Sequence, residues 1–222
     1  MTSILFYGDS NTWGFDPVTT LRYPYPLRWT TICERRLGED FHCIPEGMNG
    51  RTTAFDDPVK GARNGIQGLD YALQAHKPLD LFVVMLGTND LKYTDAQGSA
   101  EGMERLIRLV LTANERFSLS SPVFPAASDR KPSPVLLVSP IHLSGHVGGR
   151  SDDISESKRL SGYYQRIAGD YGVHFLDAAL YAGPSHVDGI HLGPEGHQSL
   201  GAVVAETIMD IFAHPSREAP VG

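Results

Sequence analysis

Residues 1–17 read MTSILFYGDSNTWGFDP, and the first apolar run of the chain, Ile4–Tyr7, ends abruptly in the motif GDSN. The run has the length and composition of a buried strand, and the glycine permits a tight bend behind it. Ser10 or Asn11 could cap a helix that begins there, because both residue types accept hydrogen bonds from the first helical N–H groups. Ser10 could instead present a reactive hydroxyl. Taken alone, the motif favours the cap, so the remaining sequence has to decide.

Short apolar runs of this kind alternate with helical patterns along the whole chain. The expected strands are Ile4–Tyr7, Phe41–Ile44, Leu81–Leu86, Val135–Ser139 and His174–Leu176. The expected helices are Arg28–Leu37, Ile66–His76, Ala100–Arg116, Ser155–Tyr171 and Pro194–Phe212. Brief strands that are apolar on both faces are typical of a parallel sheet covered by helices on each side. The pattern therefore predicts an α/β fold.

The size and charge of the chain indicate one large domain and argue against a nucleic-acid partner. We expect a single domain over residues 1–213 and a frayed tail over 214–222 of the 222-residue chain. The formal net charge is −7, with no run of Lys or Arg. The longest apolar stretch, LFVVML at 81–86, is far shorter than a membrane span, and the chain start lacks a signal-peptide pattern. We therefore expect a cytoplasmic protein without membrane insertion.

The two cysteines, Cys33 and Cys43, are expected to be buried thiols, because no disulfide framework or metal-ligand spacing surrounds them. His and Asp residues also lack a recognisable ligand set, so we expect no metal ion. A dinucleotide-binding domain is disfavoured, since no G-x-G-x-x-G follows the first strand. The sequence thus disfavours metal-dependent hydrolysis and dinucleotide binding.

Two long segments interrupt the alternation of strands and helices. Residues 118–134 are rich in Pro and Ser and are expected to form a surface excursion before the fourth strand. Residues 143–157 form a Gly/Ser loop that leads into a helix, with Asp153 or Ser155 near its cap. Loops of this length are often lids or interfaces, so we expect both to pack against neighbouring subunits and narrow the entrance to a site.

Polar, glycine-rich segments follow four of the expected strands. They are GDSN at 8–11, EGMNGRTT at 46–53, GTND at 87–90 and VDGIHLGPEGH at 187–197. In an open α/β sheet, ligands bind outside the carboxyl ends of the strands, which places these four segments at one edge. Turns alone do not require this selection of chemical groups.

The last of these segments offers a base for the Ser10 hydroxyl. Asp188 and His191 are three residues apart, so one turn can bring the carboxylate to the imidazole Nδ1 and leave Nε2 to accept a proton. The other histidines, among them His146, show no comparable carboxylate spacing, and His197 is expected on a helix surface or in the core. Such a pair is weak evidence by itself, since the chain has nine histidines.

Acyl transfer also requires donors that face the developing oxyanion. The candidates are the main-chain N–H of Ser10, the main-chain N–H of Gly50 and the side-chain amide of Asn89. Singly, Gly50 and Asn89 are typical turn residues. Arg51, beside Gly50, is expected to organise its loop through hydrogen bonds. Together these residues place a nucleophile, a base and donors on separate loops at one edge of the sheet.

These segments resemble the four sequence blocks of the SGNH (GDSL-like) hydrolases, in the family's order and over nearly the whole chain. Asn11 stands where the GDSL pattern has leucine. The stretches FYGDSNTWGFDP, EGMNGRTTAFDDP and LDLFVVMLGTND are similar to the arylesterase/acyltransferase branch, which includes a mycobacterial acyltransferase. The resemblance implies Ser10 as nucleophile, His191 as base and Asp188 as its orienter. It implies that Ser10, Gly50 and Asn89 form the oxyanion hole.

The resemblance also implies a flavodoxin-like three-layer α/β/α fold with a five-stranded parallel sheet in the order 2-1-3-4-5. It implies hydrolysis of short-chain acyl and aryl esters, acyl transfer to alcohols or hydrogen peroxide, no cofactor and a homo-oligomer. The expected partner is a small-molecule ester. Alternatives within the family are a carbohydrate acetylesterase and a lysophospholipase or thioesterase. An alternative from another class is a non-catalytic α/β module that binds a small ligand.

Several residues beside the expected site are candidates for the substrate pocket. Apolar side chains flank the site loops and either shape an apolar acyl pocket or simply pack the loops onto the sheet. These side chains are Trp13, Phe15, Phe55, Ile190 and Leu192, and the polar candidates are Asp9 and Asn11. A narrow apolar mouth would favour short acyl groups.

Overall fold

The fold is built on a five-stranded parallel sheet in the order β2-β1-β3-β4-β5. The structure, a computed structural model, describes residues 1–117, 121–125 and 133–214. The strands are β1 (Thr2–Gly8), β2 (Phe41–Gly47), β3 (Leu81–Met85), β4 (Val135–Ser139) and β5 (His174–Asp177). All five predicted strands are present, and the predicted strand order is confirmed.

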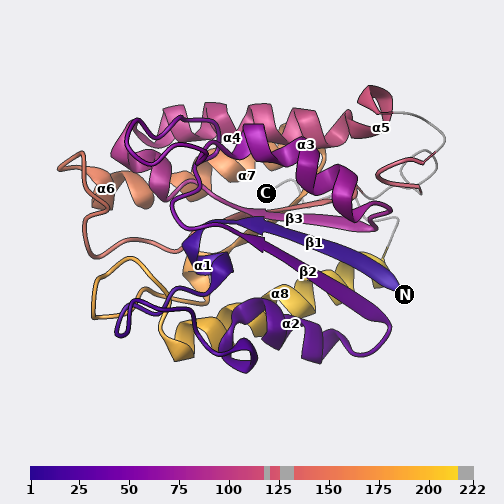
Figure 1. The fold of residues 1–222 in the computed structure, drawn as a ribbon, viewed down its shortest axis with the longest axis horizontal. Helices are drawn as coiled ribbons and strands as arrows, with labels where there is room; N and C mark the ends of the chain where they lie inside the picture. Colours follow the sequence, from indigo (N-terminus) through magenta and orange to yellow (C-terminus); the bar gives the residue numbers. More distant parts are fainter. Residues whose placement is uncertain (118–120, 126–132, 215–222) are drawn as a thin grey trace.

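Helices cover both faces of the sheet and give three layers. In Figure 1, α2 (Trp29–Leu37) and α8 (Pro194–Ala213) lie below the sheet. The helices α3 (Gly65–His76), α4 (Ala96–Leu111) and α7 (Leu160–Tyr171) lie above it. The short helices are α1 (Ser10–Trp13), α5 (Ala113–Arg116) and α6 (Asp153–Ser157), and the 3-10 turns are η1 (Tyr25–Leu27), η2 (Asn89–Lys92) and η3 (Ala178–Leu180).

Two of the predicted helices are each divided in the structure. The segment predicted over 100–116 starts earlier, at Ala96, because the Asp95 side chain caps α4 by accepting from Gly98 N, and it breaks at Thr112. The segment predicted over 155–171 breaks between α6 and α7. Asp152 holds the cap position of α6, and Asp153, which was expected near the cap, directly follows it as the first residue of the helix.

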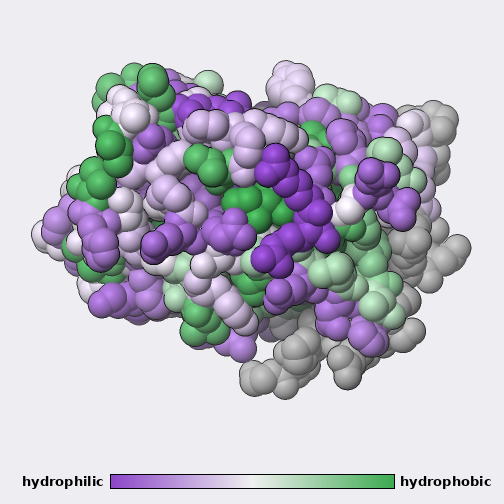
Figure 2. All heavy atoms as spheres, turned by 90° about the horizontal axis from the view of Figure 1, so that it is seen from below, coloured by the Kyte–Doolittle hydropathy of each residue, from purple (hydrophilic) through white to green (hydrophobic). Residues whose placement is uncertain are grey.

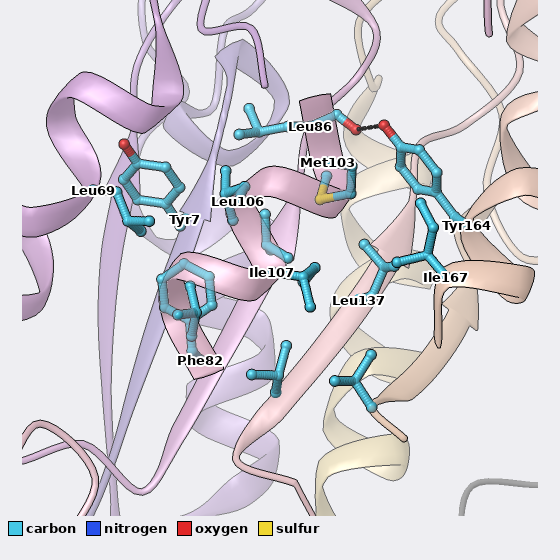
Figure 3. Close-up of a cluster of buried hydrophobic side chains, with 14 of the residues drawn as sticks. Tyr7, Leu69, Phe82, Leu86, Met103, Leu106, Ile107, Leu137, Tyr164 and Ile167 are labelled. Carbon is cyan, nitrogen blue, oxygen red and sulfur yellow. Dashed lines mark hydrogen bonds between the residues drawn. The ribbon is translucent and has the colours of Figure 1, made fainter. Parts of the chain in front are cut away.

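The side chains of β1 alternate between two hydrophobic cores, one on each face of the sheet. Leu5 and Tyr7 belong to the core under α3, α4 and α7, shown in Figure 3. There the Tyr164 hydroxyl donates to the Leu86 carbonyl oxygen at 3.1 Å, so even the polar end of this ring is satisfied. Ile4 and Phe6 belong to the core on the α2 and α8 side. With both faces covered, β1 has to be apolar at successive positions.

The second core also holds both cysteines. Cys33 and Cys43 are buried and free, as predicted. The Phe6 and Trp29 rings meet edge to face in this core, with centroids 5.0 Å apart. Outside it, the face formed by α2 and α8 is mostly hydrophilic, with hydrophobic residues in separate groups (Figure 2). Among the helices of the described ranges, none is long and apolar enough to cross a bilayer.

The described part of 118–134 and the segment 143–157 lie at opposite edges of the sheet. In the described part of 118–134, Val123 and Phe124 are buried, and the Val123 carbonyl accepts from Leu79 N at 2.7 Å. Leu79 precedes β3, so this part lies at the amino edge and does not narrow the site entrance, contrary to expectation. Residues 118–120 and 126–132 lie outside the described residues, as does 215–222 of the expected frayed tail. The segment 143–157 contacts the loop of Asp188 at the carboxyl edge.

Candidate active site

Ser10 is the first residue of α1, directly behind β1. The cap of this helix is Asp9, whose carboxylate accepts from Asn11 N at 2.9 Å, so the expectation that Ser10 or Asn11 caps it is wrong. Because Asp9 already caps the helix, the Ser10 hydroxyl is not needed as a cap. Gly8 is required for this turn, since a Cβ there would lie 2.0 Å from Thr12 Oγ1. The strand therefore ends in a turn that frees the Ser10 hydroxyl for another partner.

That partner is His191, 181 positions away in the sequence. Ser10 Oγ lies 2.9 Å from His191 Nε2, and His191 Nδ1 lies 2.6 Å from Asp188 Oδ2. With Nδ1 protonated, the imidazole donates to the carboxylate and accepts from the serine hydroxyl. The structure thus brings Ser10, His191 and Asp188 into one hydrogen-bonded chain.

The Asp188 carboxylate is held in its ionised form. Burial alone would raise its pKa, but the His191 ring and the main-chain N–H groups of His191 and Ile190 donate to it and lower the pKa below its ordinary value. A permanently charged carboxylate favours the Nδ1-protonated tautomer of His191. The Phe15 ring packs against the imidazole, with centroids 4.3 Å apart, and covers it on one side.

Asn11 fixes the main chain on both sides of His191. Its Oδ1 accepts from Leu192 N at 2.8 Å, and its Nδ2 donates to the Ile190 carbonyl at 3.5 Å. Asn11 is only 3% exposed. The prediction that it lines the substrate pocket is therefore wrong. This contact was not predicted, because the sequence places Asn11 only as a cap, a pocket residue or a departure from the GDSL leucine. In this position leucine offers neither hydrogen bond.

Gly50 and Asn89 lie beside the Ser10 hydroxyl, on the loops behind β2 and β3. Within the described part of the chain, neither the main-chain N–H of Ser10 nor that of Gly50 donates to a protein acceptor. Gly50 has a φ of +80°, a left-handed conformation that glycine adopts without strain. The Asn89 amide donates to the Arg51 carbonyl at 3.2 Å, and its oxygen accepts from Lys92 Nζ at 2.7 Å. These bonds fix the orientation of the amide.

Arg51 holds the loop of Gly50 against the end of β1. Its guanidinium donates to the carbonyl oxygens of Gly8, at 2.9 Å, and Glu46, and it lies over the Tyr7 ring at 4.0 Å from the centroid. The side chain is buried at 6% exposure, and burial lowers its pKa. Arg51 therefore has the structural position that the sequence predicts.

Two buried carboxylates next to the site were not predicted to be structural. Asp90 accepts from the main-chain N–H of Thr53, at 3.0 Å, and from its hydroxyl, which ties the loops behind β2 and β3 together. Burial raises the pKa of Asp90 to about 7 and that of Asp9 to about 6. Both directly precede or follow a predicted site residue, which is the only sequence signal they give.

A cavity of about 330 Å³ opens beside the Ser10 hydroxyl. It is lined by Ser10, Phe15, Asn49, Gly50, Lys60, Arg63, Asn89, Lys92, Val147, Ile190 and His191. Ser10, His191, Gly50 and Asn89, which come from four separate loops, therefore face one space. Asp188 lies behind His191.

Only two of the apolar pocket candidates, Phe15 and Ile190, line the cavity. Leu192 is fully buried, as is Asp9 at 2% exposure, because both pack beneath the site loops. Trp13 instead packs against Arg22, whose guanidinium lies 5.0 Å from the ring centroid. Phe55 does not line the cavity. Its main-chain carbonyl accepts from the Thr52 hydroxyl at 2.6 Å.

The expected apolar mouth is wrong, because three of the lining residues are basic: Lys60, Arg63 and Lys92. These three residues, and Asn49 and Val147 with them, were not predicted to line the site. Lys60 and Arg63 lie several residues beyond EGMNGRTT, the second site segment. Lys92 alone lies close to a motif, two residues beyond GTND. Across the described ranges, no group of three His, Cys, Asp or Glu side chains could hold a metal ion.

The match to a family model covers residues 6–199 and is to the GDSL-like lipase/acylhydrolase family. The chain belongs to this family, the SGNH hydrolases, and is a carboxylic ester hydrolase. The alternative of a non-catalytic binding module is thereby excluded. Comparison with curated proteins gave no significant match.

Solved structures of related esterases cover almost the whole chain. The chain is similar to Est24, a carbohydrate acetylesterase from Sinorhizobium meliloti, at 38% identity and a TM-score of 0.86, over 96% of this chain and 100% of that one. It is also similar to the aryl esterase of M. smegmatis, at 33% identity and a TM-score of 0.84, over 95% and 99% of the two chains. These two relatives differ in their named substrates.

Proposed function

We propose that the protein is a serine esterase that cleaves short-chain acyl and aryl esters through an acyl-enzyme. The observation that carries this proposal is the unbroken chain of hydrogen bonds from Ser10 Oγ to His191 Nε2 and from His191 Nδ1 to Asp188, at 2.9 and 2.6 Å. A serine hydroxyl is a weak nucleophile at neutral pH unless a base takes its proton during attack. His191 is placed to be that base.

In the first half of the reaction, Ser10 Oγ forms a bond to the ester carbonyl carbon as its proton moves to His191 Nε2. The resulting imidazolium is stabilised by the ionised Asp188. The carbon–oxygen bond to the alcohol then breaks, and the proton on Nε2 passes to the departing alcohol oxygen. In the second half, water gives a proton to His191 Nε2 as its oxygen bonds to the acyl carbon. The bond from that carbon to Ser10 Oγ then breaks, Oγ takes the proton back from Nε2, and the carboxylic acid leaves.

The negative charge on the carbonyl oxygen needs donors that are in place before the reaction starts. The N–H groups of Ser10 and Gly50 and the Asn89 amide are the proposed oxyanion hole. The ammonium of Lys92, which donates to Asn89 Oδ1, polarises this amide and adds positive charge nearby. All three donors come from residues that line the same cavity as His191.

The size of the cavity supports a short acyl group. About 330 Å³ lies at the lower end of the volumes common for small-molecule pockets, and part of it must hold the leaving group. Acyl transfer to an alcohol or to hydrogen peroxide is part of the proposal, since either can replace water at the acyl-enzyme. The second candidate, a carbohydrate acetylesterase, is supported by the 38% identity to Est24. An ester panel of aryl acetates and acetylated sugars, with and without an added alcohol, separates these activities.

The test of the proposed nucleophile is the Ser10→Ala variant assayed with p-nitrophenyl acetate. We expect loss of covalent catalysis and of labelling by an organophosphonate ester, because the variant has no hydroxyl to acylate or phosphonylate. Ser139→Ala is the matched control, since Ser139 is also a buried serine, at the end of β4, and its replacement should leave labelling intact. Normal hydrolysis by Ser10→Ala would end the assignment.

Two further properties stay predictions. Association of copies of this chain is supported by large hydrophobic side chains exposed between residues 18 and 27, with Val18 71% and Leu21 67% exposed. Light scattering that finds a strict monomer would contradict it. The second property is the cytoplasmic location, which stays a prediction from the sequence.

A further inference from the structure

The cavity beside Ser10 has a charge opposite to that of the whole chain. Its lining includes Lys60, Arg63 and Lys92 but no Asp or Glu among the described residues. The chain as a whole has 26 acidic and 19 basic residues and a formal net charge of −7. Positive charge is therefore concentrated where the substrate has to bind, which favours an anionic ligand there.

The backbone around these three residues is fixed by hydrogen bonds. Asp57 Oδ1 accepts from Lys60 N at 2.8 Å, and this turn directs the chain past the cavity. The Arg63 carbonyl accepts from Thr52 N at 2.9 Å, which ties Arg63 to the loop that carries Gly50. Lys92 ends η2, the turn that begins at Asn89. The positions of the three cations thus depend on the same loops as the proposed oxyanion donors.

The charged groups retain donors without a partner. Across the described ranges, no ion pair involves Lys60, Arg63 or Lys92. Arg63 Nε is buried and has no hydrogen-bond partner in the same part of the protein. Lys92 Nζ donates once, to Asn89, so two of its three N–H groups remain. A buried donor without an acceptor is costly, and a bound anion would satisfy it.

The basic and apolar residues occupy different parts of the cavity wall. Arg63 packs over Gly50, with its Nε 3.3 Å from the point where a Cβ of residue 50 would be, and Lys92 contacts Asn89. Phe15 packs on His191, the proposed donor of the proton to the leaving alcohol. Since the alcohol leaves beside His191, the acyl part is expected to extend along the basic wall.

We propose that the substrate is an ester whose acyl chain carries a carboxylate, bound by Lys60, Arg63 and Lys92. This inference rests on the proposed role of Ser10 and adds the substrate class. Arg63 suits a carboxylate because a guanidinium can donate two parallel hydrogen bonds to its oxygens. The products would be a dicarboxylate and the free alcohol.

The test compares two esters that differ in charge but little in shape. The anionic ester is the p-nitrophenyl monoester of glutaric acid, and the neutral one is p-nitrophenyl 5-methylhexanoate, in which two methyl groups replace the carboxylate oxygens. The readout is the ratio of their kcat/KM values after subtraction of the spontaneous rates. We expect a ratio of ~10, falling as salt screens the charges. A ratio of one or less would overturn the proposal.

The double variant Lys60→Gln/Arg63→Gln should lower this ratio at least ~5-fold, because two of the three proposed partners of the carboxylate lose their charge. The control Arg35→Gln/Arg36→Gln removes the same charge from the exposed last turn of α2 and should leave the ratio unchanged. An equal fall in both double variants would also overturn the proposal, since it would indicate only an effect of net charge.

Two further outcomes separate the inference from the proposed function. A preference confined to 4-acetoxybenzoate over its methyl ester would place the anion on the alcohol side and overturn the acyl-side assignment. If neither acyl ester nor p-nitrophenyl acetate is hydrolysed, the proposed function itself fails. Hydrolysis of both acyl esters at equal efficiency leaves that function in place and rejects only the inference.

Discussion

Of the four imidazole–carboxylate pairs in the described part of the chain, two lie on touching loops at the carboxyl edge of the sheet, and of these two only the pair of His191 faces a hydroxyl. His191 Nδ1 is 2.6 Å from Asp188, and His146 Nδ1 is 2.5 Å from Asp153. Their loops touch, because Ser144 N and Gly145 N donate to the Gly189 carbonyl at 2.9 and 3.0 Å. The second pair was not predicted, since its members are seven positions apart and belong to no motif.

The two pairs differ in what surrounds the imidazole. The His191 side chain is 16% exposed and its Nε2 meets Ser10, whereas the His146 side chain is 57% exposed. The fully buried Asp153 serves the main chain, accepting from Val147 N at 2.8 Å. A histidine beside an aspartate is therefore no sign of catalysis by itself. The pair of His191 differs from that of His146 because its Nε2 contacts the Ser10 hydroxyl and because unpaired main-chain N–H donors lie nearby.

The largest difference in activity is expected between variants of the two histidines. His191→Asn should lower kcat for p-nitrophenyl acetate by ~10⁴–10⁶-fold, as for the base of other serine hydrolases. His146→Asn should change kcat by no more than ~3-fold, because the exposed imidazole contacts no reacting group. Steady-state kinetics of the two purified variants measures both. Similar losses of kcat in the two variants would contradict a catalytic role for His191 alone.

The two aspartates should separate activity from stability. Asp188→Asn should lower kcat by ~10³–10⁴-fold, because an amide no longer selects the Nδ1-protonated tautomer of His191. Asp153→Asn should instead lower the free energy of unfolding by ~2 kcal/mol, since an amide N–H would face the Val147 N–H in a buried site. Urea denaturation and kinetics on both variants provide the measurement. A stable but inactive Asp153→Asn protein would reverse the assignment of the two pairs.

The sheet could be predicted because its strands are covered on both faces. A strand such as β4, buried at every position, has to be a continuous apolar run, and its predicted limits of Val135–Ser139 match the structure. The break at Thr112 was missed; there the threonine hydroxyl donates to the Arg108 carbonyl at 2.8 Å. Such a local contact leaves the apolar period of the sequence unchanged.

The convergence of Ser10, Gly50, Asn89 and His191 was predictable for a geometric reason. Each follows a strand, and the carboxyl ends of parallel strands meet at one edge. The basic wall of the cavity was missed, because Lys60 and Arg63 come from a loop whose path is set by contacts such as that of Thr52 with Arg63. No local pattern distinguishes a lysine that faces a cavity from one that faces solvent.

A smaller loss is expected when an oxyanion donor is removed while both His–Asp pairs stay intact. Asn89→Ala should lower kcat by ~10²–10³-fold, the usual effect of one such donor. Asn114→Ala is the matched control. Its amide also bonds the main chain, donating to the Phe124 carbonyl at 2.8 Å, but it lies at the opposite edge. The control should lose stability and keep its kcat. If Asn89→Ala keeps its kcat as well, Asn89 is not part of the oxyanion hole.

The smallest effect concerns His197, a histidine without a carboxylate partner. It is fully buried, and its Nδ1 accepts from Trp29 N at 3.2 Å. Burial lowers the pKa of His197 from 6.5 to about 4, so the unfolded chain binds a proton that the folded chain excludes. Its contribution is therefore fully present above pH 6.5 and is lost as the pH falls toward 4. At pH 5.5 the loss amounts to ~1.4 kcal/mol.

The variant His197→Asn keeps an acceptor for Trp29 N and removes the titration. Between pH 7 and pH 5.5 its free energy of unfolding should fall by ~1.2 kcal/mol less than that of the parent, measured by urea denaturation at each pH. Asp9 and Asp90, whose raised pKa values act in the opposite direction, are present in both proteins, so their effects cancel in the difference. Parallel pH profiles would show that His197 has the same pKa in the folded and the unfolded chain, which would require a carboxylate or water partner for its Nε2. That outcome would add His197 to the histidines that pair with a carboxylate, which are His76, His146, His191 and His214, and would weaken the contrast between His191 and the other histidines.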